Sequence, residues 1–476
     1  MTSAPTITVT SPFGAVRGLQ RDATQVFKGI PFATARRFRA PVRVTRWDGE
    51  LDATEYRAQC PQSMGIVEQA LGASAVPMDE DCLHLNVFTP GCDHAARPVL
   101  VWIHGGGYTS GSGSMNWYDG ATLGELGNVV VVTLNYRLGA LGFAGATNCG
   151  IRDQIAALQW VQDGIEAFGG DPGNVTIFGE SAGGSAVIAM FATPAANGLY
   201  RRGFAMSPSI TQLRTRERAA ATLDDFLAIT GATSLEELAE APLERLLDAQ
   251  GQLLADPGNA FTVFSPAVDG DLFDGPIAEA SFANPAPLVL GTTRDEMALF
   301  NTFNPAIAAL DLDGARAMFA KRFGEGTEAA LGAYATARPG AAPKDLVTAM
   351  QTDEVFRIPA IELAEGRLAN GGPTWMYWFT WATPAFGGGL GSCHAVDIAF
   401  AFHNLDAMGV GQFTGTGEQR IPVADAYSGA VLAFANDEDP GWPAYDLVTR
   451  TTQQIDVRSA TIDDPDGELR ELWARR

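Results

Sequence analysis

The pattern of apolar and polar residues separates a strand-rich beginning from a longer region in which strands and helices alternate. Short β-rich runs divided by turns fill the first 60 residues and predict a small antiparallel sheet at an edge. From residue 98 onward, two mostly apolar runs, 98–104 and 128–137, precede a stretch of helical periodicity at 152–168. A third apolar run, 174–178, comes next. Fully apolar strands that alternate with helices indicate a parallel sheet covered on both faces.

Helical patterns dominate much of the later chain. They extend over about 190–280 and 303–370, and strand-like runs at 286–291 and 374–384 lie between and after them. No internal repeat and no long Gly/Ser/Pro linker divides the chain. We therefore expect residues 1–476 to form a single α/β domain in which the two helical segments are insertions.

Composition excludes several classes of protein. The balance of 32 Lys and Arg against 55 Asp and Glu gives a net charge of −23, which repels phosphate backbones, so we expect no nucleic-acid partner. The longest apolar run has the length of a strand and no signal peptide is visible, so we expect a soluble, cytoplasmic protein without a membrane partner. The 5 cysteines show no C-x-x-C spacing, and we expect no metal site.

The stretch FGESAGG, residues 178–184, is the first candidate for chemistry. Ser181 follows a predicted strand and precedes an apolar helix start, which is the strand–turn–helix context of a nucleophile elbow. Glycines at 179 and 183 leave room for the chain to reverse tightly around the serine. A structural loop serine is the alternative, and the flanking strand and helix favour the nucleophile.

A serine nucleophile requires a base, and the chain contains 5 histidines. His104 ends a strand and is interpreted as structural. His394 lies in a glycine-bearing loop after the last predicted strand, whereas His403 belongs to a following apolar helix pattern. Loops at the active edge of a sheet carry function more often than helix faces do, which favours His394.

The remaining parts of a serine hydrolase site also have candidates. Asp295 and Glu296 follow a predicted strand and precede the histidine in the chain, and spacing alone does not choose between them. The HGGGY stretch at 104–108 predicts an oxyanion hole from the N–H groups of Gly106 and Gly107, joined by that of Ala182 after the nucleophile.

With these motifs placed, the chain resembles the type-B carboxylesterase family of α/β-hydrolases. The likeness extends nearly from end to end, through EDCLHLNVFTP (80–90), AFGGDPGNVTIFGESAGGSA (167–186) and the segments around the candidate acid and histidine. It implies the α/β-hydrolase fold, a mostly parallel central sheet with helices on both faces, and helical insertions that form the substrate gorge.

The resemblance also assigns residues. It implies Glu296 rather than Asp295 as the triad acid, supports His394 as the base, and gives Glu180 a supporting electrostatic role. In the family, the cysteines that match Cys60 and Cys82 form a disulfide. The resemblance thus implies a bridge between these two residues, and two thiols in a reducing cytoplasm are the open alternative.

The function expected from this combination is hydrolysis of small-molecule carboxylic esters through an acyl-enzyme, with the triad Ser181, His394 and Glu296. No metal and no organic cofactor is implied. Three alternatives stay open: a lipase for long-chain esters, a hydrolase of amides, carbamates or specialised esters, and a binding or adhesion protein that uses the same fold without catalysis.

Overall fold

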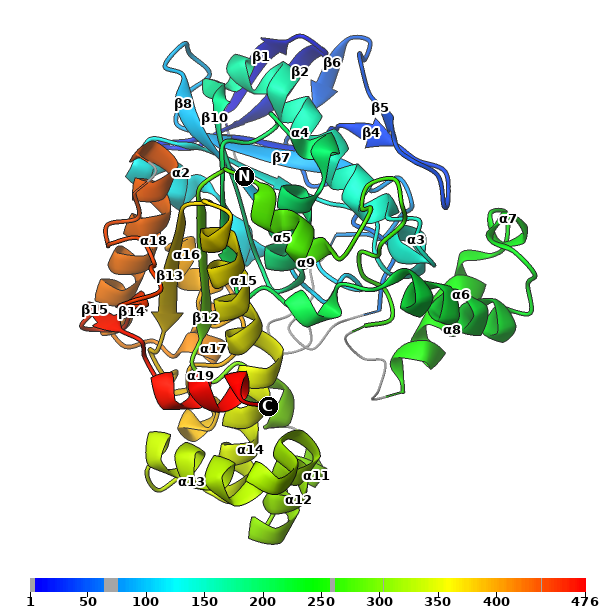
Figure 1. The fold of residues 1–476 in the computed structure, drawn as a ribbon. Coiled ribbons are helices and arrows are strands. Elements are labelled where there is room, and N and C mark those ends of the chain that lie inside the picture. The colour runs from blue at the N-terminus through cyan, green and yellow to red at the C-terminus, as the bar shows by residue number, and fades with distance from the viewer. Residues whose placement is uncertain (1–4, 64–75, 257–261, 303, 438) are drawn as a thin grey trace.

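One large sheet forms the centre of the molecule (Figure 1). The structure, a computed structural model, describes residues 5–63, 76–256, 262–302, 304–437 and 439–476. The sheet has 13 strands in the order β1-β2-β3-β7-β9-β8-β10-β11-β12-β13-β14-β15, with β6 paired to β2. These strands are β1 (Thr6–Ser11), β2 (Gly14–Gln20), β3 (Gln25–Pro31), β6 (Glu50–Asp52), β7 (His84–Thr89), β8 (Arg97–Ile103), β9 (Val130–Leu134), β10 (Gly170–Glu180), β11 (Arg202–Met206), β12 (Leu288–Thr293), β13 (Thr374–Phe379), β14 (Thr451–Ile455) and β15 (Ala460–Asp463). A separate pair joins β4 (Ala33–Thr34) to β5 (Val42–Arg43).

The two ends of the sheet are antiparallel and its middle is parallel. β1, β2 and β3 pair in antiparallel fashion at one edge, which confirms the expectation for the first 60 residues and makes them part of the main sheet. From β9 through β14 every neighbouring pair is parallel. The predicted parallel sheet is therefore confirmed.

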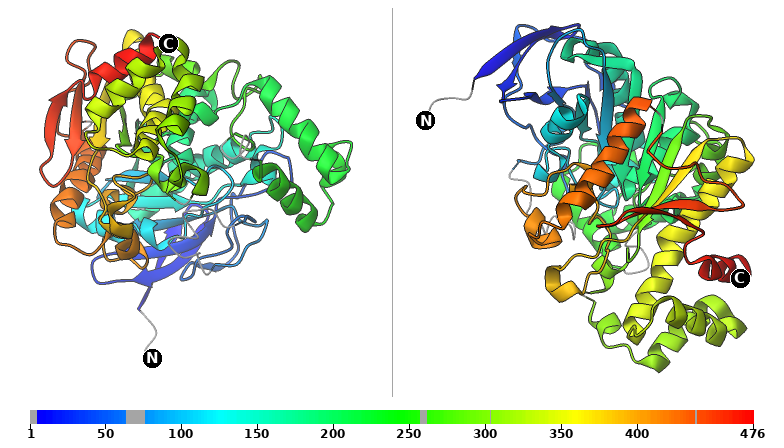
Figure 2. Two further views of the ribbon diagram at one scale, coloured as in Figure 1. Left: turned by 90° about the horizontal axis from the view of Figure 1, so that it is seen from below. Right: turned by 90° about the vertical axis from the view of Figure 1, so that its left-hand side faces the viewer.

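Helices cover both faces of the sheet, and each face has its own apolar core. Figure 2 shows α18 crossing one side while α15 lies on the other. Alternate residues of β8 face opposite sides: Val99, Val101 and Ile103 pack in one core, while Leu100 and Trp102 pack in the other. The first core is covered by α4 (Cys149–Gly164), α5 (Ala182–Ala192) and α15 (Ile358–Ala369), and the second by α2 (Ala121–Gly127), α16 (Ile398–Ala401) and α18 (Arg420–Asp437).

Further helices lie outside these layers. α6 (Arg216–Thr230), α7 (Leu235–Leu238) and α8 (Leu243–Leu254) project at one side, and α11 (Pro305–Ala308), α12 (Leu312–Phe323), α13 (Thr327–Ala337) and α14 (Pro343–Thr352) gather beyond the sheet (Figure 1). The remaining α-helices among the described residues are α3 (Gly139–Phe143), α9 (Ile277–Ala280), α10 (Ala298–Asn301), α17 (Val410–Thr414) and α19 (Gly467–Ala474). No helix among the described residues is long and apolar enough to cross a membrane.

The expectation of helices throughout 190–280 overlooked a strand in the middle of the sheet. β11 (Arg202–Met206) lies between β10 and β12, and all of its residues are buried. Its five residues include Arg202 and a glycine, so they give no apolar run that marks a strand. The arginine is tolerated inside because its guanidinium donates to Asn174 Oδ1 and to the Thr176 hydroxyl of the neighbouring β10.

A buried ion pair holds the loop that follows β9. The Arg137 guanidinium donates to both carboxylate oxygens of Asp153 in α4, at 2.7 Å each, and the backbone N–H of Arg137 donates to the same carboxylate at 3.0 Å. The side chains are only 5% and 0% exposed. Within this loop the Tyr136 hydroxyl donates to the carbonyl of His104 at 2.9 Å, so the ion pair supports the end of β8.

We expect Asp153→Asn to lower the free energy of unfolding by about 3–5 kcal/mol, because it leaves a buried guanidinium without its charge partner. Urea denaturation followed by tryptophan fluorescence measures the loss. Asp163→Asn is the matched control on the same helix: its carboxylate is 52% exposed and pairs with Arg43. The control should cost less than about 1 kcal/mol, and equal losses in the two variants would contradict the assignment.

Candidate active site

Ser181 occupies a strained turn between β10 and α5. Its backbone has φ 58° and ψ −119°, a conformation that a residue other than glycine adopts only when its surroundings impose it. The turn is packed tightly: a Cβ on Gly183 would lie 1.9 Å from the carbonyl oxygen of Ile103, and a Cβ on Gly179 would lie 2.6 Å from the same oxygen. The two glycines therefore let β10 turn against the end of β8, as the motif predicts.

The glycine-rich stretch after β8 lies beside this turn. β8 and β10 are paired, with Ile103 opposite Gly179, so residues 104–107 continue next to Ser181. Within the described residues the N–H groups of Gly106 and Gly107 have no acceptor. Ala182 is the first residue of α5, and its N–H is one of the first-turn donors that a helix leaves without an intrahelical acceptor. The three predicted oxyanion-hole residues thus come from two adjacent strand ends.

His104 has the structural position that its place in the sequence predicts. It is 1% exposed, stacks on Tyr136 with ring centroids 4.5 Å apart, and contacts the Gly105 carbonyl through Nδ1 at 2.8 Å. Burial lowers the pKa of His104 to about 4, so the ring is neutral near pH 7.

His394 and Glu296 are brought together from loops after β13 and β12. His394 Nδ1 lies 2.6 Å from Glu296 Oε2, and the other carboxylate oxygen accepts from the Thr293 N–H at 2.7 Å. The exposed fractions of the two side chains are 4% and 0%. The rings of Phe300 and Phe356 pack against the imidazole at centroid distances of 5.4 and 4.8 Å. The Thr293 N–H thus fixes one oxygen of the Glu296 carboxylate, and the other oxygen fixes the tautomer of His394.

Glu180 faces the opposite nitrogen of the same imidazole. Its Oε1 lies 3.2 Å from His394 Nε2, and among the described residues no hydrogen bond joins Nε2 to the Ser181 hydroxyl. Burial alone would lower the pKa of His394, but the Glu180 and Glu296 carboxylates outweigh it and raise the pKa to about 9. Burial in turn raises the pKa of Glu180 to about 8. The contact between Glu180 and His394 is therefore consistent with the electrostatic role that the resemblance implies for Glu180.

A third buried carboxylate, Asp397, was not found from the sequence. It is 0% exposed and accepts from the hydroxyls of Tyr427 at 3.2 Å and Tyr377 at 3.4 Å. Burial, together with the charge of Glu296, raises the pKa of Asp397 to about 7. The signal in the sequence is the position of Asp397 three residues after His394, because a loop that bends back brings residues at this separation close together.

Other sequence candidates lie apart from this cluster. His403 is not within a helix: α16 ends at Ala401, and His403 follows with φ 54° while its Nε2 contacts Asp425. Cys60 and Cys82 are both buried free thiols in contact with each other, and the hydrogen bond with Cys60, together with burial, raises the pKa of Cys82. The two cysteines are thus adjacent, as the resemblance implies, but unbridged.

Comparison with known proteins identifies the family. The sequence model of the carboxylesterase family matches residues 3–462. Para-nitrobenzyl esterase of Bacillus subtilis is 36% identical over 502 aligned residues, which cover 97% of each chain. The chain therefore belongs to the carboxylesterase family, and it is a serine carboxylesterase with the α/β-hydrolase fold.

Two further relatives support the assignment. The crystal structure of the carboxylesterase EST55 of Geobacillus stearothermophilus matches with a TM-score of 0.86 and 35% identity, over 98% of this chain and 99% of that one. Phenmedipham hydrolase of Pseudarthrobacter oxydans is 32% identical over 91% of each chain. These matches confirm the expected fold and the expected class of enzyme, against the alternative of a binding protein without catalysis.

The pH profile of kcat/KM for a p-nitrophenyl ester should respond to Glu180. The profile reports the free enzyme, in which we expect neutral His394 to be the base, so activity should rise with pH toward the His394 pKa of about 9. At this pH the Glu180 carboxyl, with its pKa of about 8, is ionised, so Glu180→Gln removes a charge that stabilises the imidazolium and the midpoint of the rise should move to lower pH. Glu166→Gln, at an exposed position before β10, is the control and should leave the midpoint unchanged. An unchanged or more alkaline midpoint in Glu180→Gln would contradict the electrostatic role.

Proposed function

We propose that Ser181, His394 and Glu296 are the catalytic triad with which this enzyme hydrolyses small-molecule carboxylic esters. The supporting observation is the 2.6 Å contact between His394 Nδ1 and the Glu296 carboxylate, next to a serine in a strained turn. This contact leaves Nε2 as the nitrogen that exchanges protons with the reacting groups.

In the acylation step, His394 Nε2 takes the proton of Ser181 as Oγ attacks the ester carbonyl. The imidazolium that forms lies between Glu296 and Glu180, both of which stabilise its charge. Nε2 must move from Glu180 to the serine hydroxyl, an adjustment that catalytic hydrogen bonds make when substrate binds. The oxyanion accepts from the N–H groups of Gly106, Gly107 and Ala182. His394 then protonates the leaving alcohol, and the acyl group stays on Ser181.

Deacylation repeats these roles with water as the nucleophile. His394 removes a proton from the water, the same three N–H groups hold the second oxyanion, and the imidazolium returns the proton to Ser181. The acid is released and the free enzyme is restored. Besides the ester and water, these steps use only groups of this chain.

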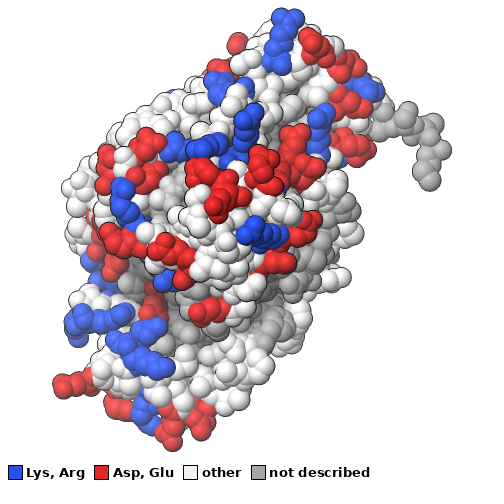
Figure 3. All heavy atoms as spheres, turned by 90° about the vertical axis from the view of Figure 1, so that its right-hand side faces the viewer, with Lys and Arg blue, Asp and Glu red and all other residues white. Residues whose placement is uncertain are grey.

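We also propose that the enzyme acts in the cytoplasm on small substrates. The 5 cysteines, Cys60, Cys82, Cys92, Cys149 and Cys393, are all free thiols, as proteins of a reducing compartment usually have. On the face of the molecule where α6–α8 project, acidic and basic side chains are interspersed (Figure 3). A surface of this kind fits dissolved esters better than a lipid interface.

A fluorophosphonate probe should label Ser181, and Ser181→Ala should lose both the label and activity by at least about a thousandfold. Peptide mass analysis locates the adduct. Ser428→Ala is a control: this buried serine donates to the Ala424 carbonyl within α18 and should not affect labelling. An adduct on another residue, or full activity in Ser181→Ala, would reject the proposed nucleophile.

A series of p-nitrophenyl esters tests the alternative of a lipase. For a small-ester hydrolase we expect kcat/KM to fall at least about tenfold between the C8 and C12 acyl chains, because longer chains exceed what the site holds. A value that keeps rising through C12, with activation at an emulsion interface, would favour the lipase instead.

A further inference from the structure

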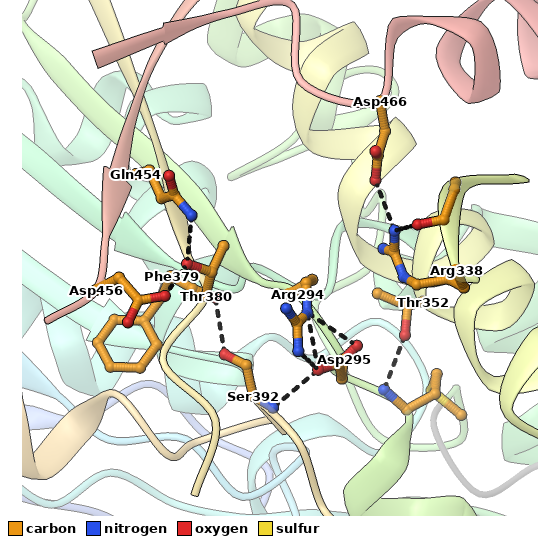
Figure 4. Close-up of polar contacts among 12 residues, drawn as sticks. Arg294, Asp295, Arg338, Thr352, Phe379, Thr380, Ser392, Gln454, Asp456 and Asp466 are labelled. Atoms are coloured by element: carbon orange, nitrogen blue, oxygen red, sulfur yellow. Dashed lines mark hydrogen bonds and ion pairs between the residues drawn. The ribbon is translucent and has the colours of Figure 1, made fainter. Parts of the chain in front are cut away.

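Two loops that carry triad residues are bonded to each other through Asp295. We call residues 294–297, after β12, the acid loop, and residues 391–394, after β13, the histidine loop. Figure 4 shows Asp295 of the acid loop beside Ser392 of the histidine loop. Asp295 lies one position before Glu296, and Ser392 lies two positions before His394, so the contact is close in the chain to both members of the acid–base pair.

The contact between the loops is reciprocal. The Asp295 N–H donates to the Ser392 carbonyl at 2.8 Å, and the Ser392 N–H donates to the Asp295 carboxylate at 2.9 Å. One position further, the His394 N–H donates to the Glu296 carbonyl at 3.3 Å. The carboxylate of Asp295 supplies the only side-chain bond of this set, and Ser392 is 0% exposed.

The histidine loop is built to let Asp295 approach. Gly391 has φ 56°, and a Cβ at this position would lie 2.5 Å from Asp295 Oδ2. A side chain here would be strained by the backbone angle and would displace the carboxylate. Glycine at 391 therefore serves the contact with Asp295.

Both loops are also anchored on their outer sides (Figure 4). The Ser392 hydroxyl donates to the Phe379 carbonyl at the end of β13 at 2.8 Å, and the Met297 N–H donates to the Thr352 hydroxyl of α14 at 3.1 Å. Arg294 pairs with the Asp295 carboxylate at 3.0 Å from the more exposed side. Each loop is thus held to its own element, and the Asp295 carboxylate joins the two loops in addition to the backbone bonds and the His394–Glu296 contact.

We propose that Asp295 is a positioning residue that fixes the histidine loop against the acid loop and so sets the distance between His394 Nδ1 and the Glu296 carboxylate. The proposal rests on the proposed function of His394 and Glu296. Because neither loop contact involves substrate, Asp295 acts on turnover and not on substrate binding. A displacement of a catalytic pair by about 1 Å costs up to about a hundredfold in rate.

Asp295→Ala and Asp295→Asn test the proposal with a short p-nitrophenyl ester. We expect Asp295→Ala to lower kcat about tenfold to a hundredfold with KM within about twofold of the parent. Asp295→Asn should recover most of kcat, because its amide oxygen still accepts from the Ser392 N–H. Asp171→Ala is the matched control. The Asp171 carboxylate also accepts a backbone N–H, from Gly173 at 2.8 Å, but it lies at the start of β10, whereas Ser181 follows the end of that strand.

Cys393 provides a readout of the loop itself. It lies between Ser392 and His394, is a free thiol and is 0% exposed. Burial raises the Cys393 pKa and the charge of Asp295 also raises it, so the comparison is made with Asp295→Asn, which removes the same charge. Alkylation by N-ethylmaleimide, located by peptide mass, should be at least about fivefold faster in Asp295→Ala than in Asp295→Asn and remain unchanged in Asp171→Ala. This readout is independent of which residue is the nucleophile. If Ser181→Ala kept full activity the proposed function would fail, and Cys393 labelling would still report the link between the loops.

The proposal is overturned if kcat of Asp295→Ala stays within about twofold of the parent, or if KM rises while kcat is preserved. It is also overturned if kcat falls without faster labelling of Cys393, since Asp295 would then act by charge and not by position. Should Asp295→Ala not fold, Gly391→Ala decides, because its Cβ would displace the Asp295 carboxylate. A joint change in kcat and in Cys393 labelling supports the proposal, and no change in either rejects it.

Discussion

The contact between His394 Nδ1 and the Glu296 carboxylate is the constraint on which the rest of the site depends. It joins two loops whose residues are 98 positions apart in the chain, and it does so where both side chains are almost completely buried. The parallel pairing of β12 with β13 makes this meeting possible, because it brings the ends of both strands to the same edge of the sheet. β11 is the spacer between this pair and the pair formed by β8 and β10, which carries Ser181 and the glycine-rich stretch.

Holding several ionisable groups inside the protein is costly, and the structure offsets the cost locally. Glu296 accepts a backbone N–H as well as the imidazole, and Asp397 accepts from two tyrosine hydroxyls. Glu180 lies with its Oε1 3.2 Å from His394 Nε2 and has a backbone hydrogen bond with Ala395. Burial raises the pKa values of Glu180 and Asp397 to about 8 and about 7, so protonation relieves part of the repulsion near neutral pH. A histidine among such carboxylates is a stronger base than one free in water.

Much of this site could be predicted from the sequence, because its residues follow the ends of strands and apolar runs in the sequence predict those strands. The elbow at Ser181 and the glycine stretch at 104–108 are local patterns, and the backbone geometry agrees with both. The choice between Asp295 and Glu296 was different. Adjacent side chains leave a turn in different directions, and spacing carries no information about direction; the resemblance to a family supplied the preference. In the structure Glu296 reaches the imidazole while Asp295 reaches the Ser392 backbone.

What could not be predicted depends on contacts between distant segments. β11 is too short and too polar to give an apolar run, and its place is defined by the strands on either side. Asp397 and the link through Asp295 matter because of what the fold places around them, and neither belongs to a motif that chemistry alone would single out. The state of Cys60 and Cys82 is likewise a matter of surroundings, since the same two residues form a bridge or remain thiols according to the redox compartment.

The turnover of Glu296→Gln tests the central claim most directly. The Thr293 N–H holds the oxygen of the glutamine amide, so the uncharged N–H₂ group faces His394 Nδ1 and cannot accept from it. The imidazole therefore loses the partner that fixes its tautomer and stabilises its charge. The account predicts a fall in kcat of about a thousandfold or more, with the fold preserved in circular dichroism and thermal unfolding. A kcat within about tenfold of the parent enzyme would contradict it, because the buried carboxylate at 2.6 Å from Nδ1 would then have no part in the reaction.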